Sequence, residues 1–169
     1  MLAESFLTPA DLKMSRKVHA AHIAVLRMLE RREVIHVADP HVDGGALFGP
    51  GAIVPMNRGF HMAVVCADSW CGTTCCIGGW VMVVASNKLD SAKRTFFCLD
   101  TLITSKAQRS LYYPPEEYEM HKIGVQEAAQ ALRNFLTHGE PRWKEVLTNE
   151  HFTPIAKFLN EHHFGKVAA

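Results

Sequence analysis

Three cysteines lie close together in the run Cys71-Gly72-Thr73-Thr74-Cys75-Cys76. The thiolate form of cysteine attacks electrophiles and binds metals, so this run has the residue types best suited to chemistry. Free cysteines are also among the residues that proteins bury most often, and buried thiols are usually inert. We therefore favour a structural role, in which Cys71, Cys75 and Cys76 pack at the entrance of a helix, and keep two chemical roles as alternatives.

A metal site is the first alternative. Zinc prefers thiolate and imidazole ligands, commonly in pairs that are two to four residues apart. Cys71 and Cys75 have such a spacing, but no matching second pair follows in the sequence. The fold would have to supply the remaining ligands: His61, Cys66 or Cys98 could complete the set, and Cys76 is a further candidate ligand. We predict no cofactor from this incomplete pattern, and zinc is the metal that it would favour.

A catalytic thiol is the second alternative. The unpaired N–H groups and the dipole at the start of a helix favour the thiolate over the thiol. Cys71 and Cys76 are the candidate nucleophiles, and His61 and His121 are the candidate general bases. In that case the run would serve a thiol- or metal-dependent enzyme.

A second set of possible metal ligands consists of His36, Asp39, His41 and Asp43, beside Gly44-Gly45. Imidazole and carboxylate together can hold zinc, iron or manganese. Asp and His are also common in turns, so we favour a solvated loop. Residues 38–59 are rich in Gly and Pro and form a long loop. Loops of this length are usually functional or mobile, so this one is a place to look for a binding surface.

The elements that must position these residues follow from the apolar pattern. Thr8 and Pro9 predict the start of an amphipathic helix that runs to about Arg32. Two β-like runs follow, at residues 34–37 and 60–66, and we expect them to pair as a long-looped hairpin.

The second half of the chain is predicted to be helical. Thr73 or Thr74 is expected to cap a helix that continues through Val84. The adjacent glycines Gly78-Gly79 suggest close approach of another backbone, so we expect this helix to be central. Further helices are predicted at 105–112, at 125–136 with Gly139 as its end, and from 153–154 to about 165. The expected fold is mainly α: a compact helical domain of about five to six helices with a small β-hairpin, formed by residues 1–169 as one domain.

Residues 60–143 resemble a group of small, uncharacterised bacterial and phage proteins. The resemblance rests on the segment Cys71-Gly72-Thr73-x-x-Cys76-Ile77-Gly78-Gly79-Trp80, with looser matches at Tyr113-Pro114 and Gly139-Glu140-Pro141-x-Trp143. It implies a helical fold in which the cysteine run opens a central helix, and a bacterial or phage cytoplasm. It implies no activity.

Composition limits the functional classes. Apolar residues make up 48% of the chain and charged residues 21%, as in an ordinary globular protein. Eighteen basic residues face seventeen acidic ones, so bulk charge draws the protein neither to nucleic acid nor to a membrane. The start of the chain does not read as a signal peptide, and an odd number of cysteines fits reduced thiols in the cytoplasm.

We therefore expect an intracellular protein-interaction module, a regulatory or phage-encoded factor without catalytic activity that acts as a monomer or homodimer. The enzyme hypothesis above is one alternative. Nucleic-acid binding is the other, because Lys106 and Arg109 lie near Tyr112 and Tyr113, and such residues can contact phosphates and stack on bases.

Overall fold

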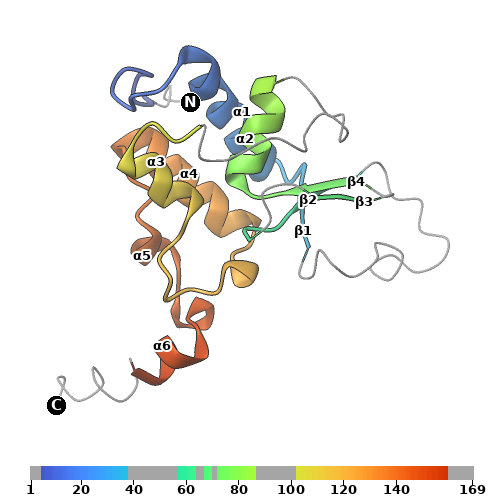
Figure 1. Ribbon diagram of the computed structural model, residues 1–169, viewed down its shortest axis with the longest axis vertical. Coiled ribbons are helices and arrows are strands. Elements are labelled where there is room, and N and C mark those ends of the chain that lie inside the picture. Colours follow the sequence, from blue (N-terminus) through green and yellow to red (C-terminus); the bar gives the residue numbers. More distant parts are fainter. Residues whose placement is uncertain (1–4, 38–56, 64–66, 70–71, 87–101, 160–169) are drawn as a thin grey trace.

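A computed structural model describes residues 5–37, 57–63, 67–69, 72–86 and 102–159 (Figure 1). It is mainly α with a small sheet at one side, as the sequence predicts. The described residues form six α-helices: α1 (Arg16–Glu30), α2 (Ile77–Ser86), α3 (Lys106–Tyr112), α4 (Val125–His138), α5 (Trp143–Val146) and α6 (Pro154–Leu159). Two 3-10 turns, η3 (Met120–Lys122) and η4 (Asn149–His151), and four strands, β1 (Ile35–His36), β2 (Asn57–Phe60), β3 (Ala67–Ser69) and β4 (Gly72–Cys75), complete them.

The first helix begins later than predicted. Thr8 does not cap it; instead the Thr8 hydroxyl donates a hydrogen bond of 2.6 Å to Asp11 and closes a separate turn. Lys13 then takes a left-handed conformation, with φ of 53°, which interrupts helical geometry. Ser15 is the N-cap of α1, and its side chain accepts a hydrogen bond from the Val18 N–H.

The predicted pairing of residues 34–37 with 60–66 is right only at Phe60 and wrong in direction, because β2 takes its other residues, 57–59, from the segment predicted as a loop. Ile35 pairs with Gly59 and His36 with Phe60, but the two strands are parallel, so they do not form a hairpin. β-Propensity marks a strand without fixing its direction, which is why the sequence did not show this. A short hairpin is present elsewhere, between β3 and β4.

The sheet has the strand order β1-β2-β4-β3, with β1, β2 and β4 parallel. The cysteine run therefore does not start a helix at Thr73 or Thr74, because residues 72–75 form a strand. Cys76 follows this strand and takes the capping role, since its sulfur accepts a hydrogen bond of 3.4 Å from the Gly79 N–H.

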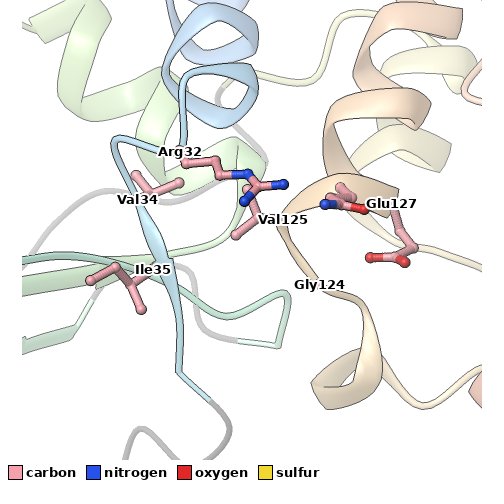
Figure 2. A pocket seen from close by; sticks show the side chains of 7 residues that line it. Arg32, Val34, Ile35, Gly124, Val125 and Glu127 are labelled. Carbon is pink, nitrogen blue, oxygen red and sulfur yellow. The ribbon is translucent and has the colours of Figure 1, made fainter.

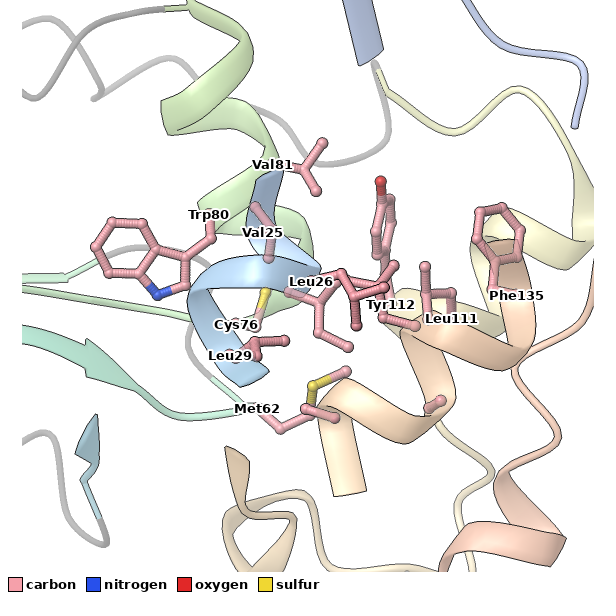
Figure 3. Close-up of a cluster of buried hydrophobic side chains, with 14 of the residues drawn as sticks. Val25, Leu26, Leu29, Met62, Cys76, Trp80, Val81, Leu111, Tyr112 and Phe135 are labelled. Carbon is pink, nitrogen blue, oxygen red and sulfur yellow. The ribbon is translucent and has the colours of Figure 1, made fainter. Parts of the chain in front are cut away.

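The prediction that α2 is central is confirmed. Every residue from Ile77 to Val83 is buried. Figure 3 shows the α1 side chains Val25, Leu26 and Leu29 among those of α2, α3 and α4, and these residues belong to one hydrophobic core.

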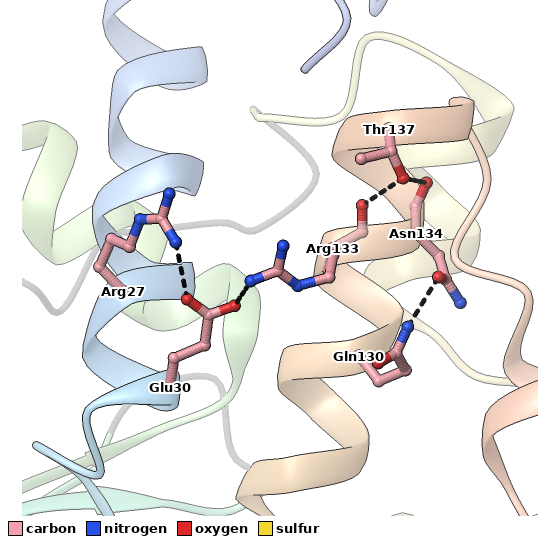
Figure 4. Close-up of polar contacts among 6 residues, drawn as sticks. All are labelled: Arg27, Glu30, Gln130, Arg133, Asn134 and Thr137. Atoms are coloured by element: carbon pink, nitrogen blue, oxygen red, sulfur yellow. Dashed lines mark hydrogen bonds and ion pairs between the residues drawn. The ribbon is translucent and has the colours of Figure 1, made fainter. Parts of the chain in front are cut away.

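The remaining predicted helices are also present. Ser105 caps α3 by accepting a hydrogen bond from the Gln108 N–H, and α4 ends at Gly139, whose φ is 80°. The last helix begins at Pro154, and its predicted continuation to about 165 lies outside the described residues. α4 is also tied to α1 by charge: Glu30 pairs with both Arg133 of α4 and Arg27 of its own helix (Figure 4).

Candidate functional site

The described cysteines occupy structural positions. Cys75 is 0% exposed and Cys76 is 2% exposed. Cys76 caps α2, and in Figure 3 its side chain lies within the hydrophobic cluster, near Leu29. Cys71, the other candidate nucleophile and ligand, lies outside the described residues.

Two candidate histidines meet at one edge of the sheet. Parallel strands end at the same edge, which is where open α/β sheets commonly place ligands. His36 is the last residue of β1, and His61 follows β2 directly. Their rings are stacked, with centroids 6.5 Å apart and an angle of 13° between the planes. The candidates His41 and Asp43 lie outside the described residues.

His121, the third candidate histidine, contacts this edge of the sheet through its backbone carbonyl. The His36 Nε2–H donates a hydrogen bond of 3.2 Å to the carbonyl of His121. The ring of His121 instead contacts Glu119, with 2.9 Å between Nε2 and the carboxylate. His61 Nδ1 accepts a hydrogen bond from the Ala63 N–H, so that nitrogen is already engaged. Among the described residues, no group of three or more His, Cys, Asp and Glu side chains is arranged to hold a metal ion.

A buried polar chain connects α1 and α3, and the sequence did not reveal it. The Tyr112 hydroxyl lies 2.7 Å from His22 Nε2 and accepts a hydrogen bond from Gln108. The Gln108 carbonyl in turn accepts from the backbone and hydroxyl of Thr104. Burial lowers the pKa of His22 to about 4 and raises the pKa of Tyr112. Tyr112 is therefore a core residue, and its predicted role in stacking on bases is wrong.

A groove lies between α3 and α5, and we call it the α3–α5 groove. Its volume is about 650 Å³. One wall comes from α3 and the residues after it, and the other comes from the residues that join α4 to α5 and from α5 itself. The lining residues are Lys106, Ala107, Ser110, Tyr113, Pro115, Glu140, Pro141, Arg142, Trp143, Lys144 and Glu145.

The floor of the groove is held in place by a buried tryptophan. Trp143 is 3% exposed, and its indole N–H donates a hydrogen bond of 2.7 Å to the Ser110 carbonyl. This bond joins α5 to α3. Asn134 of α4 donates another bond, of 3.3 Å, to the Pro141 carbonyl. These two bonds connect α5, and the residues before it, to α3 and α4.

The rim carries an aromatic ring and charges of both signs. Tyr113 is 40% exposed, and the Arg109 guanidinium lies 5.5 Å from the centre of its ring. Arg142 pairs with Glu145 at 3.8 Å. The Lys144 ammonium pairs at 3.7 Å with the carboxylate of Glu117, which does not line the groove.

Arg142 has an uncommon backbone conformation. Its φ is 51° and its ψ is 46°, in the left-handed region that favours glycine. Lys13 and Arg32 share this conformation, so it does not by itself mark a binding site.

A second, smaller hollow of about 400 Å³ lies between the end of α1 and the start of α4 (Figure 2). Arg32, Val34, Ile35 and Val125 line it. The Glu127 carboxylate stands beside Gly124, at the first turn of α4, and would repel an anion from that helix end.

Some residues that line the α3–α5 groove stand out in the sequence, but they are far apart along the chain. Nothing in the sequence indicates that Lys106, Tyr113 and the segment Gly139-Glu140-Pro141 lie together. Only the packing of α5 on α3 shows that they surround one groove.

No family model, curated protein or solved structure matches the chain. Within the described residues, no helix has the length and apolar character needed to cross a membrane.

Proposed function

We propose that this protein is an interaction module that binds another protein through the α3–α5 groove. The observation that carries the proposal is the groove itself: the hydrogen-bonded Trp143, an exposed aromatic ring and charges of both signs surround about 650 Å³. Protein interfaces are enriched in tyrosine and arginine, and these residues supply much of their binding energy.

The lining combines apolar surface with charged side chains. Five of the eleven residues that line this groove are charged: Lys106, Glu140, Arg142, Lys144 and Glu145. Such a surface suits a partner that offers charges of its own.

The described cysteines support a role in folding rather than in catalysis. Cys76 caps α2, and Cys75 is fully buried. The enzyme hypothesis stays a prediction that depends on Cys71. The bacterial or phage cytoplasm remains our expectation for where the module acts, and it rests on the sequence resemblance.

Co-precipitation with matched variants tests the proposal. The wild-type protein, Tyr113→Ala and Lys106→Glu would be used as baits in a lysate of the cells that naturally make it. Arg31→Glu is the control, because Arg31 is 71% exposed and does not line the groove. We expect one partner to be retained by the wild type and the control and lost by both groove variants. A partner retained equally by all four proteins would place binding elsewhere.

Nucleic-acid binding is the second candidate, and one observation favours it. Lys106 and Tyr113 share the groove with two further cations, Arg142 and Lys144, which come from a distant part of the chain. Fluorescence anisotropy with a labelled single-stranded oligonucleotide tests it. Binding that weakens steeply with salt and is lost in Lys106→Glu would support this candidate.

A further inference from the structure

We propose that the outer edge of β1 binds an extended segment of another protein, which joins the sheet as a further strand. This site is separate from the α3–α5 groove, so the inference goes beyond the proposed function. It follows from the direction of the backbone groups of β1, from the residue types of this strand and from the hollow beside it.

The backbone of His36 points away from the rest of the sheet. β1 is an end strand, since the strand order is β1-β2-β4-β3, and its Val37 N–H side donates a hydrogen bond of 2.9 Å to the Phe60 carbonyl of β2. Alternate residues of a strand bond to the same neighbour, so Ile35 and Val37 bond toward β2 and the N–H and C=O of His36 face the outer edge. Within the described residues, these two groups of His36 have no hydrogen-bond partner.

The residue types of β1 favour pairing at this edge. Proteins commonly protect an end strand from pairing with lysine, proline or a bulge. The segment Val34-Ile35-His36-Val37 contains neither lysine nor proline, and Ile35 is 51% exposed. An exposed β-branched side chain on an end strand is suited to pack against the side chain of an added strand.

The smaller hollow limits what can lie beside β1. Val34 and Ile35 line one side of it, and the first turn of α4, from Gly124 to Glu127, lies on the other (Figure 2). Peptides that bind by strand addition are single extended chains, and such a chain can enter between β1 and α4. The whole sheet of a second copy would instead have to occupy the place of α4, so the geometry favours a segment of a partner over a homodimer.

The charges that line the hollow define the segment further. Arg32 and Glu127 have opposite signs, and no ion pair within the described part of the chain uses either of them. A segment with one acidic and one basic residue complements both, while apolar side chains between these residues contact Ile35 and Val125. The occupant is therefore a β-branched strand of low net charge.

Two substitutions of His36 separate its backbone from its ring. His36→Pro removes the outward N–H and leaves the bonds to β2, and proline is tolerated in an end strand when its nitrogen faces outward. His36→Ala is the matched control, because it removes the ring and its bond to the His121 carbonyl but keeps the N–H. Urea denaturation of both variants checks that they remain folded.

The probe is a short fluorescein-labelled peptide of alternating valine and threonine, with a lysine at one end and a glutamate at the other. In an anisotropy titration of the full chain, we expect binding that weakens by about tenfold in His36→Pro and changes by less than about twofold in His36→Ala. The same peptide with every backbone nitrogen methylated keeps its side chains but loses its donors, and it should not bind. Tyr113→Ala alters only the α3–α5 groove and should bind the peptide as the wild type does.

Amide hydrogen exchange measured by NMR tests the edge without any substitution. We expect the His36 N–H to exchange fast in the protein alone and more slowly with the peptide, whereas the Val37 N–H, which is bonded to Phe60, exchanges slowly in both. A His36 N–H that is already protected in the protein alone would show that the edge is covered and would overturn the inference. No binding of the peptide, equal binding by His36→Pro and His36→Ala, or equal binding of the methylated peptide would overturn it as well.

Discussion

At the scale of single residues, the buried polar groups are matched donor to acceptor. A carbonyl only accepts, so the bond between His22 and the Val18 carbonyl, at 2.8 Å, places a proton on Nδ1. Nε2 then accepts from the Tyr112 hydroxyl, which itself accepts from Gln108. The imidazole is neutral in the folded protein, because a charged ring would lose its hydration without gaining an anionic partner.

His22 gives a pH dependence of stability with a definite sign. Burial lowers its folded-state pKa to about 4, below the ordinary value of 6.5. The unfolded chain therefore takes up the proton first, and stability is lost as the pH falls from about 6.5 to about 4, by about 3 kcal/mol in total. Urea denaturation at a series of pH values measures this loss. A His22→Gln variant should show a smaller dependence over the same range, and an unchanged dependence would contradict the assignment.

Cys76 gives a second prediction at this scale. Removing its sulfur in Cys76→Ala takes away the cap of α2 and leaves a small cavity, so we expect a loss of about 1–3 kcal/mol in the free energy of unfolding. Cys76→Ser keeps an acceptor for the Gly79 N–H and should lose less. Chemical denaturation compares the two variants, and equal stability of Cys76→Ala and the wild type would remove the capping role.

At the scale of elements, local sequence signals were reliable where a single residue decides a boundary. The start of α3 at Ser105 and the end of α4 at Gly139 were both predicted, since a cap acts on its own helix. The start of α1 was predicted too early because Thr8 caps a separate turn, which ends at the left-handed Lys13 before α1 begins. The direction of β1 against β2 depends on how the chain returns between them, which no local pattern encodes.

The end of α1 allows a stabilising change. The Arg32 N–H bonds to Leu29 and the Glu33 N–H bonds to Met28, which is the pattern of a Schellman motif. Arg32 occupies the left-handed position of this motif, with φ of 56°, where glycine is preferred. We expect Arg32→Gly to raise the free energy of unfolding by up to about 1 kcal/mol.

Thermal denaturation of this variant beside Arg31→Gly tests the prediction. Arg31 has φ of −81°, so glycine brings no relief of strain there and should lower the stability. A gain in stability at position 31 and none at position 32 would refute the argument.

At the scale of the whole molecule, the candidate site depends on contacts between distant segments. The Trp143 indole bonds to Ser110, 33 residues earlier in the chain, and so joins the two sides of the groove. The sequence shows which residues line the groove only as separate positions. It does not show that they lie close together, because the packing of the helices determines that. The cysteine run shows the reverse case: it was prominent in the sequence, and its described members proved to belong to the core.

Native mass spectrometry of protein purified under reducing conditions without a chelator tests the chemical alternatives. We expect the mass of the metal-free chain, because the described histidines, cysteines and carboxylates do not form a set of metal ligands. The same spectra distinguish a monomer from a homodimer. An added mass that matches zinc, and that disappears in Cys71→Ser or Cys76→Ser, would favour the metal site instead.

Photocrosslinking tests the central claim most directly. A photoreactive amino acid would replace Tyr113 at the rim of the groove or, as the control, the exposed Lys17 of α1. The account predicts that the probe at position 113 links to one partner protein in cells and that the probe at position 17 does not. Equal crosslinking from both positions, or crosslinking from position 17 alone, would contradict the claim that the α3–α5 groove is the binding site.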